Sequence, residues 1–134
     1  MQRFNQNYNQ DQKRRDEIIF GSYEPEKYKP DLRYYQGLTV EKLETLVEEG
    51  FTTKTYKFGN APTIRTFIKF MKQYEGYTAH GLVTDLSRDD YRVDVEGLEK
   101  ASEPSSCEEK KAFLTTFKKA DDKTVTGRTY CYFD

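Results

Sequence analysis

The sequence predicts the α+β class, with a small, mostly antiparallel sheet of three to four strands and about three helices packed on one face. Three segments carry apolar residues at helical spacing, in the ranges 39–50, 63–74 and 106–119. Residues 77–96 alternate between apolar and polar side chains around a polar turn, which is typical of a β-hairpin. Aromatic residues make up 15% of the 134-residue chain, which favours an ordered core built from Phe and Tyr.

We divide the chain into an N-terminal arm and aromatic strap, residues 1–36, and a single α+β domain, residues 37–134. Residues 1–17 are rich in Asn, Gln and charged side chains, which predicts a flexible or weakly helical arm. Residues 18–36 contain two prolines that interrupt regular structure, so we expect an extended strap. Its tyrosines either pack on the domain as a covering loop or bind a partner.

The first expected helix has sequence signals at both ends. Thr39 is placed to cap its first turn, and Gly50 is placed to end it in a left-handed conformation. Phe51 is then expected to contact Leu46 in a Schellman ending. The next segment, residues 51–59, is rich in Thr and aromatic residues, and we predict a short edge strand there.

The second helix, residues 63–74, presents two different faces. Four of its apolar residues recur at the spacing i, i+3, i+4 and i+7 and are predicted to enter the core; they are Ile64, Phe67, Ile68 and Met71. Its basic residues recur on the other side at i, i+4 and i+7; they are Arg65, Lys69 and Lys72. The helix is therefore predicted to bury an aromatic face and expose a basic stripe.

The hairpin loop decides which side of the first hairpin strand is buried, because side chains alternate between the two faces. We predict an odd number of loop residues, which places Val83 beside Val93 in the core. His80 then lies outside, near Asp94. An even number of loop residues would bury His80 and Leu82 instead.

The C-terminal part of the chain predicts one helix and one strand. Two capping boxes fit the start of the helix, Ser105 with Glu108 and Ser106 with Glu109. A strand follows over residues 124–133, where Gly127 marks a bulge. We expect this strand to pair beside the hairpin, and its direction stays open.

Charge and cysteine content exclude several classes of protein. The net charge of −1 gives no overall bias toward nucleic acid or anionic membrane. Cys107 and Cys131 form no zinc-binding spacing and are typical of free thiols in a reducing compartment. The sequence contains neither a signal-peptide pattern nor an apolar run of membrane-spanning length. We therefore expect a cytoplasmic protein that uses no cofactor and does not contact a membrane.

His80 is the one histidine and the candidate general base. Asp85 or Asp94 could orient its ring, but no Ser or Cys nucleophile is tied to it by a known local pattern. A structural or interface histidine fits the sequence better, so we predict no enzyme activity. The acidic turn at residues 85–90 is a candidate cation site, but it lacks the Gly and the terminal Glu of a calcium loop, so no metal is predicted.

Residues 51–72 carry basic side chains and no acidic ones. Cations neutralise phosphates, and exposed aromatic rings stack on unpaired bases. The candidate nucleic-acid-binding residues are Lys54, Lys57, Arg65, Lys69, Lys72 and the interleaved Tyr56.

Residues 85–109 have the opposite character, with nine acidic and three basic residues. Carboxylates with projecting tyrosines can occupy a basic groove on a protein partner and exclude nucleic acid from it. The candidate partner-binding residues are Asp85, Asp89, Asp90, Tyr91, Asp94 and His80.

The central third of the chain also carries three short motifs, Pro62-Thr63, Tyr77-Thr78-Ala79-His80-Gly81 and Arg88-Asp89-Asp90-Tyr91-Arg92-Val93. With these motifs the stretch resembles uncharacterised small accessory proteins carried by conjugative and other mobile elements of Gram-positive bacteria. The resemblance implies an accessory role in regulation, transfer or interference with host defence. It carries over no functional residues.

The sequence thus predicts a non-enzymatic accessory protein of a mobile element or phage that binds a protein partner. The expected partner is a host defence nuclease, inhibited in an anti-CRISPR-like or anti-restriction role. The alternative is a nucleic-acid-binding accessory or regulatory factor that uses the basic face of residues 51–72. Exposed, clustered tyrosines beside the acidic hairpin favour the first prediction, and convergence of the five basic residues on one surface favours the second.

Overall fold

The structure is a computed structural model that describes residues 8–134. Its elements, in chain order, are α1 (Gln12–Phe20), the 3₁₀ helix η2 (Pro25–Lys27), β1 (Leu32–Leu38), α2 (Val40–Glu48), α3 (Ile64–Gln73), β2 (Thr78–Thr84), β3 (Val93–Lys100), α4 (Cys107–Thr116), β4 (Asp122–Thr124) and β5 (Thr129–Tyr132).

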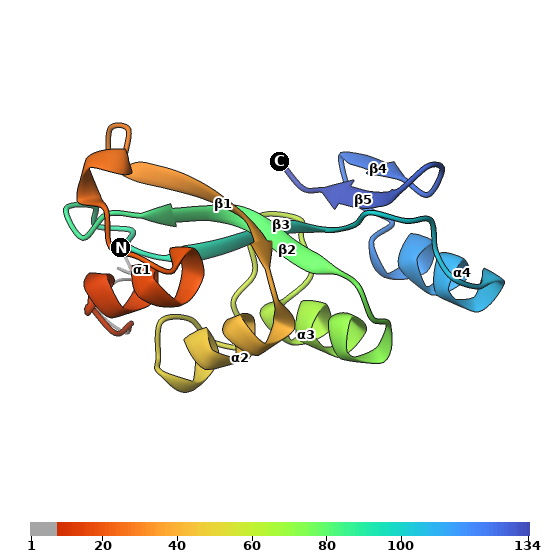
Figure 1. Ribbon diagram of the computed structural model, residues 1–134, viewed down its shortest axis with the longest axis horizontal. Coiled ribbons are helices and arrows are strands. Elements are labelled where there is room, and N and C mark those ends of the chain that lie inside the picture. The colour runs from red at the N-terminus through yellow and green to blue at the C-terminus, as the bar shows by residue number, and fades with distance from the viewer. Residues whose placement is uncertain (1–7) are drawn as a thin grey trace.

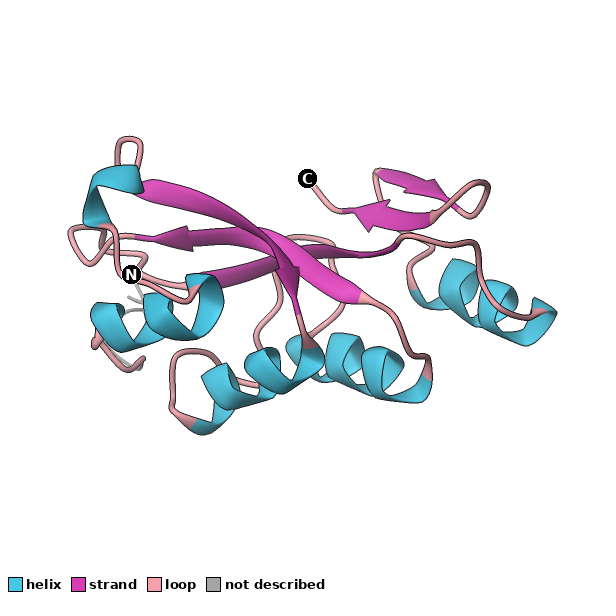
Figure 2. Ribbon diagram, in the orientation of Figure 1, coloured by secondary structure: helices cyan, strands magenta, loops and turns pink. Residues whose placement is uncertain are grey.

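The described strands form one antiparallel sheet in the order β1-β2-β3-β5-β4. In Figures 1 and 2 the four α-helices of the described residues all lie below this sheet. The α+β class is therefore confirmed. The sheet has five strands instead of three to four, and there are four α-helices instead of three.

The register of the central hairpin confirms the predicted odd loop. Val83 pairs with Val93 and Gly81 pairs with Val95, so nine residues separate the innermost pair. Val83 and Val93 are buried on the helix side of the sheet. Since side chains alternate along a strand, His80 projects from the other side.

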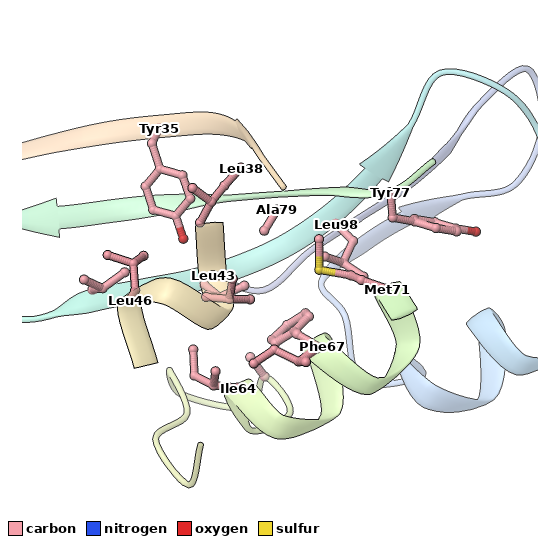
Figure 3. Close-up of a cluster of buried hydrophobic side chains, with 14 of the residues drawn as sticks. Tyr35, Leu38, Leu43, Leu46, Ile64, Phe67, Met71, Tyr77, Ala79 and Leu98 are labelled. Atoms are coloured by element: carbon pink, nitrogen blue, oxygen red, sulfur yellow. The ribbon is translucent and has the colours of Figure 1, made fainter. Parts of the chain in front are cut away.

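The core between the sheet and the helices is rich in aromatic side chains, as predicted. Figure 3 shows Phe67 and Met71 of α3 packed below Leu98 of β3, beside Leu43 of α2. Phe67 also stacks on Phe117, the residue at the end of α4, with ring centres 5.5 Å apart. Each fully buried side chain of this size contributes roughly 1.5–3 kcal/mol, so this cluster dominates the attraction between helices and sheet.

Local signals placed α2 correctly. The Oγ1 of Thr39 accepts a hydrogen bond from the Lys42 amide at 3.3 Å, which caps the start of the helix. Gly50 has φ of 84°, and the Phe51 amide donates to the Leu46 carbonyl at 2.9 Å. These contacts are the predicted Schellman ending.

The start of α4 decides between the two capping boxes. The Oγ of Ser106 accepts from the Glu109 amide at 3.0 Å, so the helix starts one residue later than the Ser105 alternative requires. The Glu109 side chain accepts in turn from the Ser105 amide at 3.3 Å. The carboxylate is also buried against Lys100 at 2.5 Å, which attaches the helix to β3.

The N-terminal segment differs from the predicted arm. Residues 12–20 form helix α1, while residues 1–7 of the arm lie outside the described residues. Arg15 and Asp16 are fully buried and paired at 3.1 Å. The Tyr28 hydroxyl accepts from Arg15 and donates to Asp16, both at 2.7 Å. The buried ion pair and the Tyr28 hydroxyl satisfy most of one another's hydrogen-bonding groups, with Arg15 Nη1 as the exception among the described residues, so this charged segment enters the fold.

Residues 32–38 form the edge strand β1, where the sequence predicts an extended strap. The register with β2 shifts between Tyr35 and Leu38, and Gly37 in the shift has φ of 70°. This bulge disrupts the alternation that identifies a strand. The predicted boundary at residue 37 consequently falls inside β1.

Two further segments differ from the prediction. The predicted strand over residues 51–59 is a loop, whose Lys54 carbonyl accepts from the Arg65 amide at 3.0 Å and so fixes the start of α3. The predicted strand over residues 124–133 is the hairpin of β4 and β5. Gly127, with φ of 79°, belongs to the connection between them and not to a bulge.

Candidate functional site

The acidic hairpin is neutralised by its own arginines. Arg88 contacts Asp90 at 2.6 Å and Asp31 at 3.2 Å. Arg92 contacts Asp90 as well, and Asp94 at 2.8 Å. Hydrogen bonding from Arg88 is the main reason that the pKa of Asp90 falls to about 2. The carboxylates therefore bind one another through two arginines and are not an unpaired acidic surface.

The predicted partner-binding residues do not form one exposed face. Tyr91 and Asp94 have no exposed surface, because Tyr91 lies under Arg15 and Asp94 lies under the loop that precedes α3. Asp85 accepts a hydrogen bond from Gln12 at 3.1 Å. Asp89 is exposed, as the prediction requires.

His80 lies at the far end of β2 from the other predicted residues. Its ring stacks on Tyr130 with centres 5.2 Å apart, and Nδ1 lies 3.9 Å from a Glu99 oxygen. Both ring nitrogens are buried and make no hydrogen bond to the described residues. Burial lowers the pKa of His80, against the attraction of Glu99. The carboxylate beside its ring is therefore Glu99, and neither Asp85 nor Asp94, the two candidates for orienting it.

His80 lines a hollow of about 310 Å³ that we call the tyrosine hollow. Its principal residues are Tyr34, His80, Glu96, Glu99, Tyr130 and Tyr132, from strands β1, β2, β3 and β5. Tyr34 and His80 alternate with Tyr35 and Ala79, which point into the helix-side core in Figure 3. The hollow thus belongs to the face of the sheet opposite the helices.

A bulge in the β2–β3 pairing places an acidic residue in the hollow. Gly81 pairs with Val95 but His80 pairs with Gly97, which leaves Glu96 as the extra residue. A Cβ on Gly97 would lie 1.9 Å from the Cys131 carbonyl oxygen and 2.5 Å from His80 Nε2. Gly97 therefore allows β5 and the histidine ring to approach β3, and the bulge directs the neighbouring carboxylate into the space between them.

Glu96 is the chemically unusual group of the hollow. It is 4% exposed, and its carboxylate makes no hydrogen bond or ion pair with any described residue. Burial raises its pKa to about 7, with further contributions from the negative charges of Asp94 and Asp134. Arg92 opposes the shift but is already committed to the hairpin carboxylates. The carboxylate consequently changes its charge near neutral pH.

The neighbouring carboxylate, Glu99, has a different environment. Arg128 lies 3.9 Å from Glu99 and stacks over Tyr130 at 4.5 Å from the ring centre. In the hollow, the Glu99 carboxylate therefore faces a cation, Arg128, whereas the Glu96 carboxylate has no ion-pair partner among the described residues. Tyr34, at its rim, is 66% exposed.

The sequence pointed to only part of this site. The sequence indicates His80 as a candidate residue, and Glu96 lies within the acidic segment of residues 85–109, but no sequence pattern connects either of them with the tyrosines. The alternation of Tyr130 and Tyr132 around Cys131 was a readable signal that both project from one face of a strand. Tyr34 carried no such signal, because its strand was predicted as a strap.

The basic residues converge more completely than the acidic ones. Lys54, Arg65, Lys69 and Lys72 line a second hollow, of about 450 Å³, that we call the basic hollow. Lys72 also pairs with Glu44 of α2 at 2.8 Å. Lys57 is exposed but does not line the hollow. The Tyr56 hydroxyl donates to Asp94 at 2.5 Å, and its half-buried ring does not line the basic hollow.

No helix of the described part of the chain is both long and apolar enough to cross a membrane. Within residues 8–134, no three His, Cys, Asp or Glu side chains come together in a metal-binding cluster. Comparison with protein families, with curated proteins and with solved structures found no match for this chain.

Proposed function

We propose that this chain is a non-enzymatic binding protein that acts by occupying a protein partner with the tyrosine hollow. The observation that carries the proposal is the gathering of Tyr34, Tyr130 and Tyr132 in one hollow on the sheet face opposite the helices. The helices all lie on the other side of the sheet (Figure 2). Tyrosine offers a large apolar ring and a polar hydroxyl at small conformational cost, which suits a protein interface. The uncovered strands supply a rigid base for these side chains.

As the partner we propose a nuclease of host defence, with the protein acting as an accessory inhibitor from a mobile element or phage. The charges of the hollow support this class of partner. Glu96 and Glu99 line it, and Asp134 lies close enough to raise the pKa of Glu96. A nuclease binds nucleic acid with Lys and Arg side chains, so its groove is complementary to carboxylates among tyrosines.

The test is capture of a partner from host lysate with tagged protein, with and without nuclease treatment. The decisive comparison is the double variant Tyr34→Ala/Tyr132→Ala, with Tyr23→Ala as control because Tyr23 is an exposed tyrosine that does not line the hollow. We expect a partner that survives nuclease treatment, binds the control like wild type and binds the double variant at least about tenfold more weakly. Equal capture by all three proteins would contradict the proposal.

The basic hollow supports a second candidate, a nucleic-acid-binding factor. Four cationic side chains from α3 and the preceding loop line it. Neutralised phosphates release counterions, so binding of a single-stranded oligonucleotide should weaken steeply as salt increases. Lys69→Glu should abolish such binding. Absence of binding by the wild type at low salt rejects this candidate.

A further inference from the structure

We infer that the tyrosine hollow is a receptor for one arginine side chain of the partner, whose guanidinium pairs with the Glu96 carboxylate between Tyr34 and Tyr132. The inference rests on the proposed function and specifies its chemistry. It is carried by the carboxylate that lines the hollow without a partner of its own among residues 8–134.

The first step concerns the charge of the incoming group. A buried carboxylate without a hydrogen-bond donor is costly, so a ligand that supplies donors and positive charge gains more than a neutral one. Asp94 and Asp134 add negative potential around Glu96, and Arg92 is occupied by the hairpin carboxylates. The same charges repel a phosphate or a carboxylate. Arg128 also lines the hollow, but it faces Glu99 and stacks over Tyr130, so the space beside Glu96 favours a cation.

The second step concerns the shape of the cation. A guanidinium is planar, stacks on aromatic rings and donates two parallel hydrogen bonds to a carboxylate, whereas an ammonium does not match that geometry. The same combination of contacts is already present in the hollow, where Arg128 stacks over Tyr130 and faces Glu99. Tyr130 is engaged by His80 and Arg128, which leaves Tyr34 and Tyr132 to contact the incoming group.

The third step concerns size. The hollow, of about 310 Å³, lies at the lower end of the range of roughly 300–1,000 Å³ found for small-molecule pockets. It therefore fits one long side chain better than a helix or a nucleotide. Tyr34 at the rim remains accessible for the stem of that side chain.

The direct test is an NMR titration of the full chain with N-acetyl-arginine amide. N-acetyl-citrulline amide is the matched control, because it has nearly the same shape without the charge. We expect saturable shifts of the Glu96, Tyr34 and Tyr132 signals with the arginine compound and at least about tenfold weaker binding of the citrulline compound. Equal binding of the two compounds, or no shift at these residues with the arginine compound, would overturn the inference.

The carboxylate is tested by Glu96→Gln, with Glu48→Gln on the exposed surface of α2 as control. Gln keeps the shape of the side chain, and an unchanged amide spectrum away from the hollow establishes that the variant is folded. We expect Glu96→Gln to weaken binding of the arginine compound at least about tenfold and the control to leave it unchanged. Equal affinity of the two variants would overturn the role of Glu96.

The pH dependence is a second, independent readout. The charged or titratable groups near Glu96 are Asp94, Arg92, Asp134, His80, Glu99, Arg128 and the tyrosines of the hollow. With a pKa of about 7 for Glu96, its ionised fraction rises about 30-fold between pH 5.5 and pH 8, and the affinity for the arginine compound should rise with it. An affinity that does not change over this range would contradict the pairing.

The partner itself separates this inference from the proposed function. If Glu96→Gln captures the partner like wild type while Tyr34→Ala/Tyr132→Ala does not, the hollow binds a protein but the arginine receptor is refuted. If the double variant also captures the partner normally, the proposed function fails. Loss of capture in both variants supports both.

Discussion

Replacing Glu96 with Gln is expected to stabilise the protein at pH 8 far more than at pH 5. Glu96 is 4% exposed as a residue and its carboxylate has no hydrogen-bond donor among the described residues, and burial raises its pKa to about 7 from an ordinary value of 4.5. Between these two values the native state holds a proton that the unfolded state has released. The free energy of unfolding of the wild type therefore falls as pH rises through this window.

The magnitude follows from the difference between the two pKa values. One pKa unit corresponds to 1.36 kcal/mol, so a carboxylate ionised against a pKa of about 7 costs the native state about 3 kcal/mol at pH 8. At pH 5 the native carboxyl is protonated, and the same calculation leaves a cost of about 1 kcal/mol. Gln removes the cost at both values, so its stabilising effect should differ by about 2 kcal/mol between them.

Urea unfolding followed by circular dichroism at pH 5 and pH 8 measures this difference. Glu48→Gln removes the same charge from the exposed surface of α2, so subtracting its effect isolates the contribution of the Glu96 environment. With a denaturant slope of about 1–3 kcal/mol/M, the midpoint at pH 8 should rise by roughly 1–3 M. Equal shifts at the two pH values, or destabilisation at pH 8, would refute the reasoning that Glu96 is a desolvated, unpaired carboxylate.

Three further substitutions test the architecture. Arg15→Ala removes the counter-charge of the buried Asp16 and should lower the free energy of unfolding by about 3–5 kcal/mol, whereas Arg14→Ala removes an exposed ion pair and should lower it far less; thermal unfolding of the two variants distinguishes an integral α1 from a solvated arm. Gly97→Ala places a Cβ 1.9 Å from a carbonyl oxygen of β5 and should lower the free energy of unfolding by about 1–3 kcal/mol, with faster amide hydrogen exchange in β5. Unchanged exchange would contradict the close approach of β5 to Gly97. Phe67→Ala should cost about 3–5 kcal/mol by guanidinium unfolding, and a loss below about 1 kcal/mol would mean that this ring is not central to the core.

The helices with strong local signals were predictable. The capping and Schellman signals of α2 depend on residues within a few positions of one another, and the structure forms the same hydrogen bonds. The apolar stripe of α3 likewise enters the core, with Ile64, Phe67, Ile68 and Met71 buried. For the central hairpin the sequence favoured an odd loop but left an even one open, and the register of β2 with β3 decides for the odd loop.

The N-terminal elements were not predictable in this way. Helix α1 buries Arg15 and Asp16, and composition identifies such residues as solvated unless the partner that satisfies them is known. That partner, Tyr28, lies beyond the end of the helix. In β1 the bulge at Gly37 breaks the alternation, and its pairing with β2 is a contact between residues about fifty positions apart.

The two candidate surfaces show the same limit. The basic hollow could be predicted in large part, because three of its cations lie on one helix at spacings of three and four residues. The acidic surface could not, because Arg88 and Arg92 pair with the carboxylates that sequence counting treats as unpaired. Net charge along a segment says how many charges are present and not which of them already have partners.

The sequence by itself determined the α+β class, the ends of α2 and the buried face of α3, because each depends on short-range periodicity or on a local hydrogen bond. Only the tertiary structure decided that Tyr34, Glu96 and Tyr132 share one hollow. These residues come from three strands, and the sheet order together with a single bulge in β3 brings them together. Strand order and bulge position arise from long-range pairing, in which the shift of one residue turns a side chain from one face of the sheet to the other.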